Sequence, residues 1–203
     1  MVPQPDPRQP FRSSVKDKAE LRKTLAARRQ VAFEADGDAG ARLAQVFQNH
    51  GPPVAKGAVV AGFWPIKTEI DVRPLMAHLR GAGAQLALPY APDRLGGLDF
   101  KRYDGGPPRG VDAWGIPAPA KNAQVLRPDI VLVPLLGFDR QGGRIGYGAG
   151  LYDRALTQLR QGGAVSAIGV GYAVQEVGEI PREAHDALLD WVITEEGVKL
   201  RPS

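Results

Sequence analysis

The sequence predicts an α/β fold in three layers, a mostly parallel sheet with helices on both faces. Short apolar runs alternate with helical patterns through the middle of the chain, which is typical of parallel strands joined by helices. The segment Asp129–Leu136 is almost continuously apolar, as expected of a strand buried on both faces. The chain has 203 residues, 43% of them hydrophobic, which suits one domain. We therefore expect a single domain over residues 16–203 after a disordered lead at 1–15, whose prolines and polar residues cannot offset the entropy of ordering.

The chain is predicted to begin with two helices. Good helix formers dominate Lys16–Ala35, and a second helix is expected over Ala39–Asn49, ended by Gly51 and two prolines. At about 100° per residue, the first helix carries an apolar stripe with a basic stripe beside it. The apolar stripe holds Leu21, Leu25 and Ala32, and the basic one Lys18, Arg22 and Arg29. From the residues alone, these cations are expected at the rim of the buried face, with their stems covering apolar surface.

Strands and helices then alternate. Asp71 is predicted to cap a helix in which apolar residues recur at helical spacing, at Val72, Leu75, Met76 and Leu79. Another helix is expected over Ala149–Arg160, and an ordered loop over Gly105–Pro119. The expected strands are Ala58–Phe63, Gln85–Leu88, Leu98–Tyr103, Asp129–Leu136, Ala164–Val170 and Trp191–Thr194.

Composition excludes several kinds of site and partner. The absence of cysteine excludes disulfides, thiolate metal sites and a cysteine nucleophile. No apolar run is long enough to cross a bilayer and the N-terminus has no signal-peptide core, so we expect a cytoplasmic protein without a membrane partner. The net charge of +4 indicates an anionic partner but does not choose among nucleic acid, a membrane and a phosphate ligand. No long basic stripe with interleaved aromatics is present, so we expect no nucleic-acid partner. We also expect a monomer.

The densest chemical signal follows the buried strand and leads into a helix. In open α/β sheets, ligands bind at the carboxyl ends of the strands, where glycines let the backbone approach a ligand and a helix N-terminus favours phosphate. Arg144 is expected to contact phosphate and Asp153 to hold Mg²⁺. The glycine spacing alone matches neither standard nucleotide motif and is also typical of a tight turn. For Asp139, a turn-capping role and an active-site role are both open.

The whole string from Pro134 to Asp153 resembles the signature of the 5-formyltetrahydrofolate cyclo-ligase (methenyltetrahydrofolate synthetase) family. That signature reads roughly P-x-x-x-F-D-x-x-G-x-R-x-G-x-G-x-G-x-Y-D. The matching residues are Pro134, Phe138, Asp139, Gly142, Arg144, Gly146, Gly148, Gly150, Tyr152 and Asp153. The first helix is similar to the family's K-x-x-L-R at Lys18–Arg22, and Phe63–Leu75 and Gly115–Pro119 resemble further family segments.

The resemblance implies a NagB/RpiA-like, Rossmann-like form of the fold and an enzyme. Its reaction joins 5-formyltetrahydrofolate and ATP to give 5,10-methenyltetrahydrofolate, ADP and phosphate, with Mg²⁺ as cofactor. It implies that Lys18, Arg22, Arg144 and Asp153 act on the nucleotide, together with the loop residues Gly146, Tyr147, Gly148, Ala149, Gly150 and Tyr152. Arg144 and Asp153 are the implied catalytic pair, and Arg144→Ala is predicted to lower turnover far more than stability.

Folate binding is implied for Glu69, Trp64, Trp114 and Tyr152, the two tryptophans as a flat wall for the pterin ring. Taken without the resemblance, Glu69 is a loop carboxylate near a helix start and the aromatic residues are packing residues. The chain departs from the family pattern at Ala118, where glutamate is usual, and at Tyr147 and Ala149, where one branch has basic residues. The alternative function is therefore a family paralogue that binds reduced folate or nucleotide without catalysis.

Overall fold

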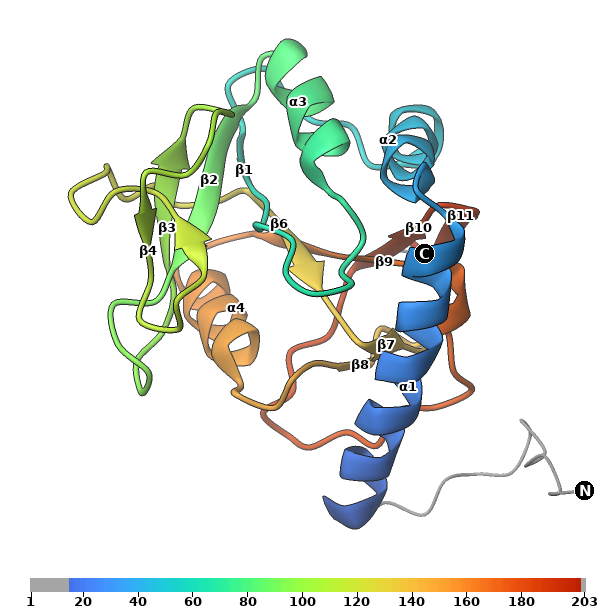
Figure 1. Cartoon of the computed structure of the whole chain (residues 1–203). Helices are drawn as coiled ribbons and strands as arrows, with labels where there is room; N and C mark the ends of the chain where they lie inside the picture. Colours follow the sequence, from blue (N-terminus) through green and yellow to red (C-terminus); the bar gives the residue numbers. More distant parts are fainter. Residues whose placement is uncertain (1–14, 202–203) are drawn as a thin grey trace, which may run out of the picture.

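The computed structural model describes residues 15–201, and the expected disordered lead, apart from Val15, lies outside this range. The described chain forms a seven-stranded sheet in the order β11-β10-β9-β6-β1-β2-β3, with helices on both sides (Figure 1). The strands of this sheet are β1 (Val59–Ala61), β2 (Gln85–Tyr90), β3 (Asp99–Tyr103), β6 (Ile130–Pro134), β9 (Ser166–Gly171), β10 (Trp191–Thr194) and β11 (Gly197–Leu200). The helices are α1 (Val15–Ala35), α2 (Ala39–His50), α3 (Arg73–Gly81) and α4 (Leu151–Gln161), with a 3₁₀ turn, η1, at Ala173–Gln175.

The centre of the sheet is parallel and its two edges are antiparallel. Strand β1 pairs in parallel with β2 and β6, and β9 with β6 and β10, whereas β3 and β11 run antiparallel to their neighbours. The edge strand β11 was not expected from the sequence; all four of its residues are only half-buried, so no continuous apolar run marks it. The predicted α/β class with a mostly parallel sheet is confirmed.

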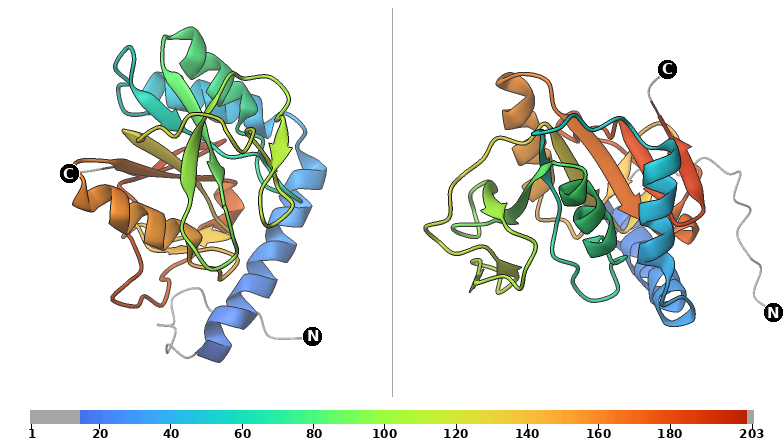
Figure 2. Two further views of the ribbon diagram at one scale, coloured as in Figure 1. Left: turned by 90° about the vertical axis from the view of Figure 1, so that its left-hand side faces the viewer. Right: turned by 90° about the horizontal axis from the view of Figure 1, so that it is seen from above.

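Side chains of the central strands alternate between two cores. In β6, Ile130 and Leu132 belong to the core under α2 and α3, whereas Val131 and Val133 belong to the core under α4. Helices α2 and α3 therefore cover one face of the sheet and α4 the other (Figure 2). This double burial is the reason that β6 reads as an uninterrupted apolar run.

Most of the buried face of helix α1 lies outside the two main cores, although Ala32 packs against the core under α2 and α3. Its residues Leu21 and Leu25 pack in a third cluster with Leu136, Ile145 and Ile180, beyond the carboxyl end of β6. The apolar stripe of the sequence prediction is confirmed, but the placement of Arg29 at its rim was wrong, because this side chain is buried and only 2% exposed.

Several local predictions also need correction. The N-cap of α3 is Val72 rather than Asp71, although the Asp71 carboxylate accepts a hydrogen bond from the Arg73 amide. Helix α4 begins at Leu151, two residues later than expected. Residues in the expected loop and turn form two small antiparallel pairs, β4 (Gly110–Val111) with β5 (Pro117–Ala118), and β7 (Gly137–Phe138) with β8 (Arg144–Ile145). Among the described residues, no helix has the length and apolar character needed to cross a membrane.

Candidate functional site

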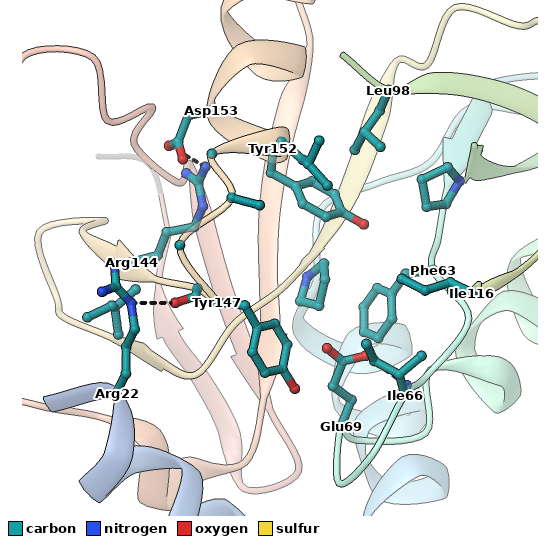
Figure 3. Close-up of a pocket in the computed structure, with 18 of the residues that line it drawn as sticks. Arg22, Phe63, Ile66, Glu69, Leu98, Ile116, Arg144, Tyr147, Tyr152 and Asp153 are labelled. Atoms are coloured by element: carbon teal, nitrogen blue, oxygen red, sulfur yellow. Dashed lines mark hydrogen bonds and ion pairs between the residues drawn. The ribbon is translucent and has the colours of Figure 1, made fainter. Parts of the chain in front are cut away.

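A cavity of about 360 Å³ opens where β1 and β6 end, between α1, the start of α4 and the loop after β1 (Figure 3). One end is lined by charged groups and the other by apolar and aromatic side chains. The predicted site residues on its wall are Lys18, Arg22, Trp64, Glu69, Arg144, Gly146, Tyr147, Gly148, Ala149, Gly150, Tyr152 and Asp153. The structure thus brings together side chains that are more than 100 residues apart in the sequence.

The glycine loop, residues 146–150, connects β8 to α4. Gly148 and Gly150 have φ values of 99° and 65°, in the left-handed region that residues with a side chain rarely adopt, and Gly150 is the N-cap of α4. From α1, Arg22 Nε donates to the Gly146 carbonyl at 3.0 Å. The loop is therefore held against the basic stripe of α1, and a helix N-terminus, which favours anions, lies at the cavity wall.

Arg144 and Asp153 form a partly buried ion pair at the charged end. Arg144 Nη2 donates to Asp153 Oδ1 at 2.6 Å, and Nη1 donates to the Ala187 carbonyl. The Arg144 side chain is 7% exposed, and burial lowers its pKa from the ordinary value, although the Asp153 carboxylate opposes this shift. Asp153 Oδ1 also accepts from the Ala187 amide at 3.1 Å. The predicted pair is close together, but two of the five guanidinium donors are already in use.

Lys18 is held by two carboxylates that sequence reasoning did not assign to the site. Its Nζ lies 2.8 Å from Glu183 Oε1 and 3.4 Å from Asp186 Oδ2, and both acids line the cavity. Burial alone would lower the pKa of Lys18, but its hydrogen bond to the Glu183 carboxylate and the charge of Asp186 outweigh this effect, so the pKa is raised. Lys18 therefore reaches the cavity as a fixed ammonium group.

The donor set at this end suits one kind of magnesium site only. Over residues 18–201, whose side chains the structure describes, no group of three or more acidic, histidine or cysteine side chains is arranged to hold a metal. In the same range, no hydrogen bond engages Asp153 Oδ2. Mg²⁺ commonly uses one or two protein carboxylates and takes its other ligands from phosphate and water. The residues fit such an ion, but they do not form a cage made of protein ligands.

The opposite end of the cavity is apolar, with one buried acid. Its apolar wall includes Phe63, Ile66, Leu98 and Ile116. Glu69 is 6% exposed, and its Oε2 accepts a hydrogen bond from the Ile66 amide at 3.0 Å. Burial raises the pKa of Glu69 to about 7, against the opposing effects of this hydrogen bond and of the Arg29 charge. A carboxyl group that titrates near neutral pH in a cavity is a candidate for a functional role.

The aromatic side chains differ in their placement. Tyr152 lies at the wall of the cavity, and burial raises its pKa, so it remains a neutral phenol. Trp64 is also on the wall, with the Arg73 guanidinium 5.3 Å from its ring centre. Trp114 does not line the cavity: it is 40% exposed, and the Arg94 guanidinium lies 5.4 Å from its ring centre. The structure therefore does not bring the two predicted tryptophans together as one wall.

Asp139, for which two roles were open, organises the turn between β7 and β8. It is fully buried, and its carboxylate accepts from the backbone amides of Gln141, Gly143 and Ile180 at 2.7–2.9 Å. It does not line the cavity. Sequence reasoning missed the contribution of Asp112 and Ile116 to the cavity wall; the Gly115–Pro119 match was the one available signal for this loop.

Comparison with known proteins gives a consistent result. A model described as the 5-formyltetrahydrofolate cyclo-ligase family matches residues 14–195. The 5-formyltetrahydrofolate cyclo-ligase of Escherichia coli K12 is 31% identical over 172 residues, which cover 82% of this chain and 93% of that protein. The Mycolicibacterium smegmatis protein of the same name is 30% identical, covering 89% and 95%. The structure of Aquifex aeolicus 5,10-methenyltetrahydrofolate synthetase superposes with a TM-score of 0.72 at 30% identity, covering 91% of this chain and 92% of that one.

Proposed function

The chain belongs to the 5-formyltetrahydrofolate cyclo-ligase family of enzymes, and on that premise we propose that it uses ATP to close 5-formyltetrahydrofolate to 5,10-methenyltetrahydrofolate, releasing ADP and phosphate. The observation that carries the proposal is the two-ended cavity. Cations and a helix N-terminus gather at one end, and an apolar wall with a buried acid at the other. The first end suits a triphosphate and the second a flat heterocycle.

The chemistry requires the formyl oxygen to become a better leaving group. In the proposed reaction this oxygen attacks the γ-phosphorus, the bond to the β-phosphate oxygen breaks, and ADP leaves. N10 of the folate then attacks the activated carbon, the C–O bond breaks with release of phosphate, and N10 loses its proton. No protein nucleophile is needed, so catalysis rests on positioning and on neutralising phosphate charge.

The assignment of residues follows the two ends of the cavity. Lys18, Arg22 and Arg144 act on the phosphates, and the loop of residues 146–150 provides backbone approach to them. Arg144 keeps further guanidinium N–H groups beyond the two that bond Ala187 and Asp153, which supports a direct phosphate contact. Fixed donors aimed at developing charge typically contribute about 3 kcal/mol each to transition-state stabilisation.

Asp153 would hold Mg²⁺ through Oδ2, with Asp186 a further carboxylate on the same wall. Bound there, the ion would neutralise phosphate charge. Asp153 also keeps Arg144 in place, so the carboxylate has two tasks. At the apolar end, Glu69 is assigned to a polar edge of the folate and Tyr152 to its ring.

The proposal is tested with purified protein, 5-formyltetrahydrofolate, ATP and Mg²⁺, followed by near-ultraviolet absorbance of the methenyl product. We expect product only when all components are present, with one ADP formed per methenyl group. Folate that binds without product formation under complete conditions would support the non-catalytic paralogue instead, and product formation without ATP would refute the phosphorylation route.

A further inference from the structure

Arg29 is a buried cation that lies behind the cavity wall rather than on it. Its side chain is 2% exposed, and its guanidinium donates to three groups. Nε donates to Thr68 Oγ1 at 3.1 Å, Nη1 to the Leu135 carbonyl at 3.3 Å, and Nη2 to the Tyr147 hydroxyl. Glu69 Oε1 is 4.0 Å from Nη1. Burying a guanidinium costs several kcal/mol before its partners compensate, and an apolar residue would fill the same space without that cost. This arrangement therefore points to a role other than packing.

The partners of Arg29 come from three segments that each form part of the cavity. Thr68 and Glu69 belong to the loop after β1, Leu135 follows β6, and Tyr147 is in the glycine loop. Residues 146–150 carry no charged side chain of their own, so the cation behind this loop is supplied by α1. Lys67 adds a second contact between the loops, with Nζ 4.8 Å from the Tyr147 ring centre. Within residues 15–201, Lys67 is the one non-glycine residue with positive φ, at 54°.

The donor chemistry of this contact fixes the direction of the Tyr147 hydroxyl. A guanidinium has donors but no acceptor, so the Tyr147 oxygen must accept the hydrogen bond from Arg29. The phenol hydrogen is then directed away from Arg29. The Tyr147 ring is half-exposed, lies on the cavity wall and extends toward Glu69 (Figure 3). Burial raises the pKa of Tyr147, so the hydrogen is present at neutral pH.

We propose that Arg29 is a positioning residue that orients Tyr147 as a hydrogen-bond donor to an oxygen of the bound substrate and keeps the glycine loop in register with Glu69. The inference rests on the proposed function for the identity of the substrate, whose formyl and phosphoryl oxygens are suitable acceptors. Tyr147 is the group that contacts substrate, and Arg29 acts through it. Helix α1 thereby serves the site twice, with Arg22 anchoring the backbone of the loop and Arg29 its tyrosine.

The charge of Arg29 also reaches Glu69. The groups that act on this carboxyl are Arg29 from α1, Lys67 from its own loop, and the phenols of Tyr147 and Tyr152. Both cations favour the ionised carboxylate, whereas burial opposes it. Removing the Arg29 charge will therefore raise the pKa of Glu69 further, and the limb of the pH–rate profile that reports Glu69 will move to higher pH. Loss of packing alone would not move it in this way.

The test is a double-mutant cycle with Tyr147→Phe, Arg29→Met and their combination, together with Arg29→Lys. The control is Arg28→Met, an exposed neighbour on the same helix. We expect Tyr147→Phe to lower kcat by about 10- to 100-fold, as for loss of one positioned donor, and to lower Tm slightly because the buried Arg29 Nη2 loses its acceptor. Arg29→Met should lower kcat by a similar factor, and the combined variant should be no worse than Arg29→Met. Arg29→Lys should restore the pH profile, and Arg28→Met should match the wild type.

Several outcomes would overturn the proposal. They are wild-type kcat in Tyr147→Phe, effects of the two single changes that multiply in the combined variant, or an unshifted pH profile in Arg29→Met. If Arg29→Met does not fold, the test rests on Tyr147→Phe and Arg29→Lys. Tyr147→Phe keeps the aromatic ring, and Arg29→Lys keeps a cation at this position. If the wild type forms no methenyl product, the proposed function fails separately. The same cycle is then measured as the Kd of 5-formyltetrahydrofolate in the presence of ATP, where equal and non-additive losses support the positioning role and unchanged Kd values refute it.

Discussion

Replacing Arg144 by lysine or by methionine separates its charge from its hydrogen bonds. In Arg144→Met, the Ala187 carbonyl and the Asp153 carboxylate both lose a donor. Breaking a buried ion pair costs about 3–5 kcal/mol. Because the Asp153 side chain is 24% exposed and keeps its bond from the Ala187 amide, we expect a loss below that range, about 2–3 kcal/mol.

This loss translates into a measurable change in Tm. For a domain of this size, each kcal/mol lowers Tm by about 2–4 °C, so Arg144→Met should melt roughly 4–12 °C below the wild type. Arg144→Lys keeps the charge and one contact, and should lose about 1 kcal/mol. The structure thus revises the sequence prediction for Arg144→Ala, because removal of this side chain affects stability as well as turnover.

Turnover is measured below the melting range of every variant. If Arg144 contacts the transferring phosphoryl group, Arg144→Met should lower kcat by about 100- to 1000-fold and Arg144→Lys by at least about tenfold, because an ammonium cannot reproduce the planar guanidinium contacts. Thermal unfolding by circular dichroism and steady-state methenyl formation give the two readouts. Wild-type kcat in a folded Arg144→Met variant would remove Arg144 from the catalytic machinery, and an unchanged Tm would show that the Asp153 pair has no structural role.

Three further predictions concern other parts of the molecule. The Glu69 carboxyl titrates near pH 7 in the folded state and near its ordinary, lower pKa when unfolded; stability from this group is therefore present at low pH and lost as pH rises from about 4.5 to 7. Glu69→Gln should flatten the stability curve across that window in denaturant titrations, and an unaltered slope would contradict the assignment. Gly143→Ala should lower Tm, since a Cβ there would lie 2.5 Å from Asp139 Oδ2, whereas Gly146→Ala has open space and should keep its Tm while losing activity. Leu25→Ala should cost about 2–5 kcal/mol, because this side chain is fully buried in the cluster that seats α1; a smaller loss in chemical denaturation would show that α1 is anchored elsewhere.

Sequence reasoning predicted the parts of the fold in which the local residue pattern matches the burial of the element in the folded chain. Strand β6 is buried on both faces, and the uninterrupted apolar run from Ile130 therefore predicts the strand. Strand β11 lies at an edge and none of its residues is fully buried, so its pairing with β10 leaves no pattern in the sequence. The β4–β5 pair is shorter still, with two residues in each strand, and β5 contacts β2, so its position depends on tertiary neighbours as well as on its own residues.

The site shows the same division. The string around Arg144 and Asp153 predicted a connected unit because those residues are close in the chain, and the structure brings them into contact. The prediction placed Arg29 at the rim of the buried face, which was wrong. Helical periodicity gives the direction in which its side chain leaves α1, but not which segments pack against that side chain. Its partners come from loops whose positions are fixed by tertiary packing. Trp114 was assigned by its position in a loop, yet it lies outside the cavity while Ile116 of the same loop lines it.

If the formyl oxygen attacks the γ-phosphate within this cavity, that oxygen must leave with the released phosphate. The measurement uses 5-formyltetrahydrofolate labelled with ¹⁸O in the formyl group, followed by mass analysis of the released phosphate. We expect one ¹⁸O atom per phosphate for each methenyl group formed. Unlabelled phosphate, with the label appearing in water, would mean that the oxygen leaves by another route.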